Sequence, residues 1–160
     1  MLSLVLAMFA AGSGDGSRQA RVQRLKGIKA VVAVFQVEKA IKEEMGPILR
    51  EAGITMVTME EAQRLPETSV AYLVCDAIVE EQDSIKNTQI AVPRLRIIRV
   101  APVANNPVEN GQMELWEWHR IVVASPEIDG SSRAACGKVN STFVAAAKEL
   151  AADWSAANGK

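Results

Sequence analysis

The single histidine, His119, is the side chain best suited to acid–base or metal chemistry near neutral pH. Glu117 lies two residues earlier, and in the strand predicted here the two side chains point to the same face. Together they offer two ligands for a metal ion, whereas catalytic zinc normally has three ligands from the protein. The sequence shows no third ligand. We therefore predict no metal site and interpret Glu117 and His119 as members of a partly exposed cross-strand ion pair.

Other patterns typical of catalysis are missing from the sequence. The serines near the predicted turns, Ser125, Ser131 and Ser132, are not part of a Gly-x-Ser-x-Gly motif. Neither a Gly-x-Gly-x-x-Gly motif nor a phosphate-binding loop occurs. We therefore predict a protein that is not an enzyme and that has no cofactor. A hydrolase that uses His119 is kept as a third hypothesis.

The two cysteines, Cys75 and Cys136, fall in a predicted strand and a predicted helix. Their spacing is not that of a metal-binding motif. In an exported chain they could form one disulfide bond, because a strand and a helix can place two cysteines face to face. The alternative is that both are small buried apolar side chains. The sequence leaves both interpretations open.

Trp116 and Trp118 are two of the three tryptophans in a chain with only 4% aromatic residues. Alternation places them on the strand face opposite His119, together with Arg120. Tryptophan and arginine are enriched where proteins contact their partners, so Trp116, Trp118 and Arg120 form a candidate binding surface. The alternative is that the tryptophans cover the core beneath the last helix. We favour this alternative for Trp116 and leave it open for Trp118.

The elements that would position these residues follow from hydrophobic periodicity and from turn residues. In chain order we expect a strand at 27–37, a helix at 38–52 that is kinked or divided at Gly46-Pro47, a strand at 54–57, a short helix after the capping box of Thr58 and Glu61, strands at 69–80, 89–100 and 113–124, and a helix at 131–157. Pro93 indicates an edge position or a bulge. Residues 101–111 contain turn residues and predict a long loop.

This order predicts an α+β fold, a two-layer α/β sandwich. We expect a mixed, mostly antiparallel sheet of four to five strands with two main helices on one face, in the order β-α-β-β-β-β-α.

Length and composition predict one globular domain, because the chain has 160 residues, of which 49% are hydrophobic and 23% charged. The net charge is −1 and no basic stripe is present, which excludes a typical nucleic-acid-binding protein.

Residues 1–11 contain one polar side chain, Ser3. They are too few to span a bilayer but are typical of a signal peptide.

We therefore expect residues 1–12 to direct export, so that the protein is periplasmic or secreted. Residues 1–17 form the signal peptide and a linker, and residues 18–160 form one domain. The alternative is that residues 1–11 are a helix or strand of the fold itself.

Four segments and three later residues of the chain form a recognisable pattern: LKGIKAVVAV, ILREAGITMVT, LPETSVAYLVCDAIV and LWEW, together with Phe143, Trp154 and Asn158. This pattern resembles that of a group of small secreted bacterial proteins of no established activity. The strand–helix order is also similar to that of a domain in curli-export and penicillin-binding-protein-activator lipoproteins. That similarity implies protein contacts and oligomeric assembly, not catalysis. The chain departs from these lipoproteins because no cysteine follows its leader directly.

The first functional hypothesis is therefore a non-enzymatic exported accessory protein, associated with the cell envelope, that binds protein or assembles into oligomers. The second is a carrier of a small molecule or lipid. Its pocket would lie between the sheet and the last helix, where the small side chains of Ala145, Ala146, Ala147 and Ala151 could leave room, although they equally allow close packing.

Overall fold

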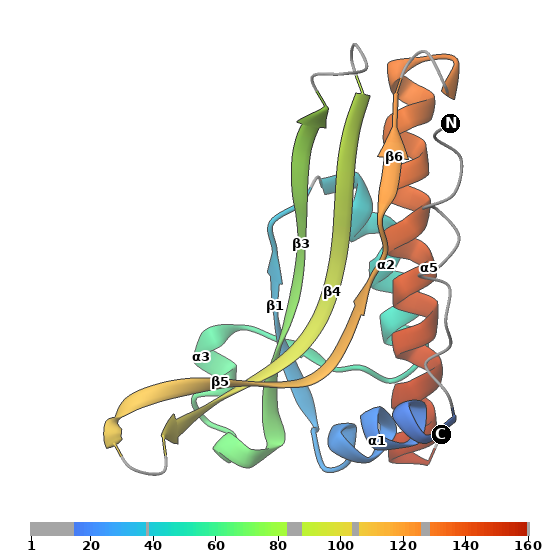
Figure 1. Cartoon of the computed structure of the whole chain (residues 1–160). Helices are drawn as coiled ribbons and strands as arrows, with labels where there is room; N and C mark the ends of the chain where they lie inside the picture. Colours follow the sequence, from blue (N-terminus) through green and yellow to red (C-terminus); the bar gives the residue numbers. More distant parts are fainter. Residues whose placement is uncertain (1–14, 38, 83–87, 104–105, 126–128, 160) are drawn as a thin grey trace.

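The computed structural model describes residues 15–37, 39–82, 88–103, 106–125 and 129–159 (Figure 1). The elements in chain order are α1 (Asp15–Leu25), β1 (Ala30–Phe35), α2 (Lys39–Glu51), β2 (Met56–Val57), α3 (Met59–Ala62), a 3-10 turn (Glu67–Ser69), β3 (Val70–Gln82), β4 (Thr88–Val103), β5 (Asn106–His119), β6 (Val122–Ala124) and α5 (Ser132–Asn158). The predicted α+β class is confirmed: helices pack against a mixed sheet, and the longest of them ends the chain.

The sheet has the order β2-β1-β3-β4-β5, and β6 also pairs with β4. β1 is parallel to both β2 and β3, whereas β3, β4 and β5 are antiparallel. β6 continues β5, because the pairs Arg94–His119 and Ala91–Val122 keep one register on either side of the interruption.

The interruption between β5 and β6 lies opposite Pro93, which has no N–H to donate to the neighbouring strand. The backbone N–H of Arg120 bridges this position by donating to the Pro93 carbonyl at 3.4 Å. β4 lies between β3 and β5, so an edge position for Pro93 is wrong. The proline is tolerated because the pairing on that side stops for two residues.

The long loop predicted at 101–111 is also wrong, because β4 and β5 continue as a hairpin through most of it. Ala101 pairs with Gly111 and Pro102 with Asn110, and the register shifts directly after Pro102. Figure 1 shows this hairpin extending past α3, away from α5. Turn-forming residues therefore do not exclude strand pairing here, although β4 ends at Val103 and β5 begins at Asn106 within the same segment.

The core lies between the sheet and the helices α2 and α5. Alternate residues of β4 enter it, and they are completely or almost completely buried together with one stripe of each helix. The main contributors are Val31, Met45, Leu49, Leu73, Cys75, Leu95, Ile97, Trp116, Phe143 and Leu150. Among the described elements, none of the long helices lies on the opposite side of the sheet, which we call the open face (Figure 1).

Local signals fix the ends of the helices. The Thr58 hydroxyl accepts from the backbone N–H of Glu61, whose carboxylate accepts from the N–H of Thr58, as the capping box predicts. Ser131 caps the start of α5, and Gly159 ends it in the left-handed conformation with a φ of 72°.

The helix α2 runs through Pro47 without a break, so two separate helical pieces are not formed. Glu43 and Pro47 are both exposed, so water can reach the Glu43 carbonyl, which has lost its usual N–H donor.

The helix α1 was not predicted, and it begins at Asp15, inside the segment expected to be a linker. The expected leader, residues 1–12, lies outside the described residues. None of the described helices is long and apolar enough to cross a membrane.

Candidate binding face

The open face is built from rows of side chains that cross β3, β4 and β5/β6. One row contains Ile78 and Val92, and counting on from the pair Arg94–His119 places Ile121 opposite Val92. The next row pairs Ile90 with Val123. We call these five residues the aliphatic band. Three of its members are well exposed: Ile121 at 67%, Ile78 at 45% and Val123 at 40%.

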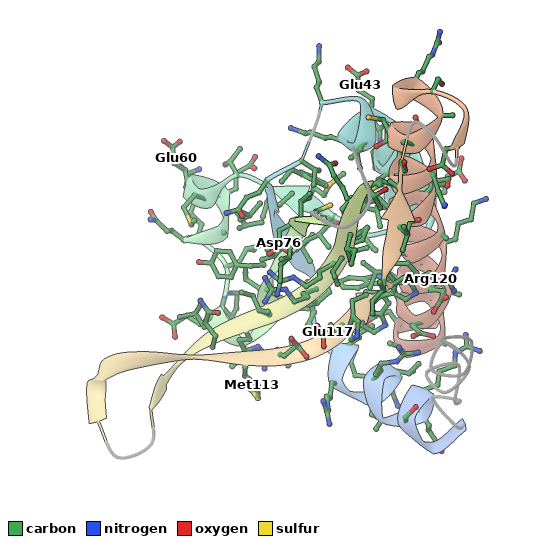
Figure 2. The ribbon with its side chains drawn as sticks, turned by 45° about the horizontal axis from the view of Figure 1, so that its top comes forward. Glu43, Glu60, Asp76, Met113, Glu117 and Arg120 are labelled. Atoms are coloured by element: carbon green, nitrogen blue, oxygen red, sulfur yellow. The ribbon has the colours of Figure 1, made fainter. Side chains whose placement is uncertain are left out.

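Two charged rows lie directly beside the aliphatic band. The first is formed by Asp76, Arg94 and His119, and the second contains Arg96 and Glu117. Figure 2 shows Asp76 and Glu117 on their strands, and Met113 further along β5 on the projecting hairpin. The open face therefore combines an apolar half with a charged half.

Asp76 fixes the two arginines of the charged rows. Its carboxylate accepts from Nε and Nη2 of Arg94 at 2.8 and 3.0 Å, and from Nη2 of Arg96 at 2.7 Å. The side chain of Asp76 is only 11% exposed, and these hydrogen bonds raise the pKa of Arg94. Two cations share one carboxylate, so the part of these rows on β3 and β4 has an excess of positive charge, with Glu117 of β5 directly beside it.

A second acidic group lies on β5. Burial raises the pKa of Glu114, and the charge of Glu117 and a hydrogen bond between the two carboxyl groups raise it further. The nearby Arg96 acts in the opposite direction. Even when Glu114 and Glu117 share one proton, the pair keeps one negative charge, so this edge of the face is acidic.

His119 lies where the sequence predicts it, beside Glu117, with Nδ1 at 3.4 Å from Oε1 of the carboxylate. The pair is formed within one strand and not across two strands, and it is charged when His119 is protonated. In the part of the chain that the structure describes, no group of three side chains could hold a metal ion.

The predicted binding surface of Trp116 and Trp118 is wrong, because these side chains are only 1% and 7% exposed. Both point into the core, on the side of the sheet that the helices cover. Arg120 is exposed, and its guanidinium carbon lies 5.4 Å from the centroid of the Trp118 ring. The alternative, that the tryptophans cover the core, is the correct one.

Trp116 also takes part in a buried polar cluster centred on Asp153 of α5. Its Nε1 donates to Oδ2 of Asp153 at 2.9 Å, and Nε of Arg18 donates to Oδ1 at 2.7 Å. A nitrogen of Arg21 lies 3.7 Å from the same carboxylate. This cluster attaches α1 to α5 and to β5. Arg18 and Asp153 are 135 positions apart, so no local pattern could have indicated it.

The disulfide considered for Cys75 and Cys136 is not formed. Both cysteines are free: Cys75 is buried in the core and Cys136 is exposed on α5. Burial, with a smaller contribution from the charge of Asp76, raises the pKa of the Cys75 thiol to about 12. Cys75 therefore acts as a small apolar side chain of the core.

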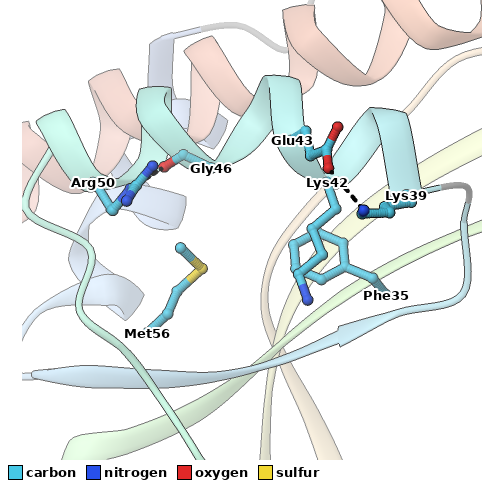
Figure 3. Close-up of a pocket in the computed structure, with 7 residues that line it drawn as sticks. All are labelled: Phe35, Lys39, Lys42, Glu43, Gly46, Arg50 and Met56. Atoms are coloured by element: carbon cyan, nitrogen blue, oxygen red, sulfur yellow. Dashed lines mark hydrogen bonds and ion pairs between the residues drawn. The ribbon is translucent and has the colours of Figure 1, made fainter.

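The space between the sheet and α5, expected to hold a carrier pocket, is filled by side chains. Phe143, Ala146, Ala147 and Leu150 are at most 1% exposed there, so the small residues permit close packing. A pocket of about 550 Å³ lies elsewhere, between α2 and the strands β1 and β2 (Figure 3).

No family model and no curated protein matches the chain. A similar arrangement is found in the crystal structure of rare lipoprotein B from Shewanella oneidensis, with a TM-score of 0.39 and 14% sequence identity. The match covers 76% of this chain and 89% of that chain. At these values the likeness concerns the arrangement of strands and helices alone. The similarity to the curli-export and penicillin-binding-protein-activator domain stays a prediction.

Proposed function

We propose that this chain is an exported, non-enzymatic accessory protein that works by self-association, with the open face of a second copy as the partner. The observation that supports this most directly is the aliphatic band beside fixed charges, on a sheet face that none of the described long helices covers. Export is supported by the apolar leader pattern, and the non-enzymatic role by the lack of a catalytic motif in the sequence.

The composition of the band is unusual for a sheet face in contact with water. The solvent side of an antiparallel sheet normally carries alternating polar residues, whereas the band places Ile78, Ile121 and Val123 there. Contiguous exposed aliphatic side chains with a polar border are typical of protein contact sites. Stacking against a second sheet would remove them from water.

The charges favour a second copy over a partner of a single charge sign. The centre of the face has an excess of positive charge, because Arg94 and Arg96 share Asp76. The edge formed by Glu114 and Glu117 has an excess of negative charge. A two-fold axis through the face can place the acidic edge of one copy over the basic centre of the other, which is the self-complementarity that a closed dimer requires.

The test compares two substitutions of exposed apolar residues. Ile121→Asp places a charge in the aliphatic band, and Leu65→Asp places the same charge outside it, at a residue that is 36% exposed. Sedimentation velocity over a wide range of concentrations should show a monomer–dimer equilibrium for the unmodified chain and for Leu65→Asp. The Ile121→Asp variant should stay monomeric. A monomer at every concentration for the unmodified chain, or equal behaviour of the two variants, contradicts the proposal.

A further inference from the structure

A second surface, away from the open face, combines positive charge with an apolar floor. It is the pocket of about 550 Å³ between α2 and the edge of the sheet, a size typical of sites for small organic ligands. Its lining residues are Phe35, Lys39, Lys42, Glu43, Gly46, Arg50 and Met56. Figure 3 shows the five residues of α2 above Phe35 and Met56, which come from the strands.

The pocket exists because the sheet stops early beneath α2. The edge strand β2 has only two residues and pairs with β1 at Val31 and Val32, so β1 continues to Phe35 without β2 beside it. The wall formed by α2 is open at Gly46, where an added Cβ would meet no atom within 4 Å. A short edge strand and a glycine together leave the space that side chains would otherwise fill.

The rim of the pocket has an excess of positive charge. Three cations line it against the single carboxylate of Glu43, which pairs with Nζ of Lys39 at 3.4 Å. Neither Lys42 nor Arg50 takes part in an ion pair with any residue that the structure describes. The ammonium group of Lys42 lies over the Phe35 ring, 5.7 Å from its centroid, so one cation of the rim is close to the apolar floor.

We infer that this pocket binds an amphiphilic anion, with its apolar chain on Phe35 and Met56 and its carboxylate or phosphate group at the cationic rim, which extends along α2 from Lys42 to Arg50. A purely polar anion would leave the aromatic ring and the thioether without an apolar contact. A neutral amphiphile would leave the two cations without a counter-charge. The site does not depend on the proposed self-association, because it lies on α2 and the edge of the sheet.

The experiment titrates the chain with dodecanoate and with dodecyl phosphate below their micelle concentrations, using isothermal calorimetry. We expect one saturable site for at least one of the two, and the tighter ligand identifies the preferred head group. The double reversal Lys42→Glu/Arg50→Glu should weaken binding by about tenfold or more. The matched control Arg133→Glu/Lys148→Glu makes the same charge change at exposed residues of α5 and should leave binding within about twofold.

Further titrations determine whether the ligand needs both its negative charge and its apolar chain. Dodecyl maltoside, which is neutral, and dodecyltrimethylammonium should bind at least about tenfold more weakly than the anions. Ile121→Asp should not change binding, because the aliphatic band is a different surface. The inference is overturned if neutral and anionic amphiphiles bind equally, if inorganic phosphate alone binds as tightly as dodecyl phosphate, or if the Lys42/Arg50 reversal has no effect while the circular dichroism spectrum shows an intact fold.

Discussion

Two aspartates on opposite sides of the same sheet each bind two arginines. They differ in their burial and in the elements that supply the arginines. Asp153, on α5, is 2% exposed and receives its arginines from α1 and an indole N–H from β5. Asp76, on β3, is 11% exposed, and both of its arginines come from the neighbouring strand β4. The side-chain chemistry is therefore similar, while the elements that are joined differ.

The difference assigns a separate role to each cluster. The contacts of Asp153 join three elements that are distant in the sequence, so they contribute to the position of α1. The strands that Asp76 links are already paired through eleven successive residues of backbone. The contacts of Asp76 therefore add little to the fold, and their main effect is to fix the charges of the open face.

The largest effect is expected for Asp153→Ala. This change leaves the buried Trp116 N–H without an acceptor and removes the partner of two arginines, so the free energy of unfolding should fall by about 3 kcal/mol. Urea denaturation followed by tryptophan fluorescence measures the loss. Asp153→Asn is the matched control, because its amide oxygen can still accept from Trp116, and it should lose less. A loss below about 1 kcal/mol for Asp153→Ala would mean that α1 is held mainly by apolar contacts.

A smaller effect is expected for Asp76→Ala. Removing Asp76 leaves no buried indole N–H without an acceptor, and water can solvate Arg94 and Arg96, which are 28% and 22% exposed. We expect a loss of about 1 kcal/mol in the same urea experiment. A loss equal to that of Asp153→Ala would contradict the distinction between the two clusters and would make Asp76 a structural residue of the sheet.

A third prediction, with a smaller expected effect, concerns how salt changes the destabilisation caused by the same two substitutions. Screening acts strongly on charges that water reaches and weakly on buried ones. The destabilisation by Asp76→Ala should therefore shrink at high sodium chloride, whereas that by Asp153→Ala should change little. Measuring both variants in low and high salt gives the two differences directly, and an equal response of both would show that exposure does not separate the clusters.

The sequence predicts the parts of the fold that local patterns determine. The stripe of apolar residues along α2, the capping box at Thr58 and the caps of α5 all lie within a few positions of the element that they define. The sequence-based prediction fails where a residue far away in the sequence determines whether an element forms. The helix α1 has only a short apolar stripe, with Leu25 fully buried, and its arginines bind an aspartate near the other end of the chain.

The candidate site was missed for a related reason. The alternation of Arg94 and Arg96 with Leu95 and Ile97 already indicates a strand with one charged face. Asp76 is the only charged residue between positions 69 and 79, which indicates a partner on a neighbouring strand. These signals require the strands to be aligned before they can be combined. The tryptophans of β5, in contrast, were considered for a binding surface because of their residue type alone, although they lie in the core.

The smallest effect, and the one most specific to the open face, is expected for Glu114→Gln. The pKa of Glu114 is raised from its ordinary value of 4.5, so the folded state holds this proton more tightly than the unfolded state does. The favourable contribution of the protonated form is complete below the ordinary pKa and is lost as the pH rises through the raised pKa. Glutamine resembles the protonated form, so the variant should be slightly more stable than the unmodified chain near pH 7, and the difference should vanish near pH 4.

Urea midpoints at both pH values measure this change, with Glu149→Gln on the exposed side of α5 as the control for net charge. A variant that is less stable near pH 7 would show that the attraction of Glu114 to Arg96 outweighs its burial and its repulsion by Glu117. In that case the acidic edge would be neutralised within the molecule. The complementary contact that we propose between two open faces would then lose its electrostatic basis and would depend on the aliphatic band alone.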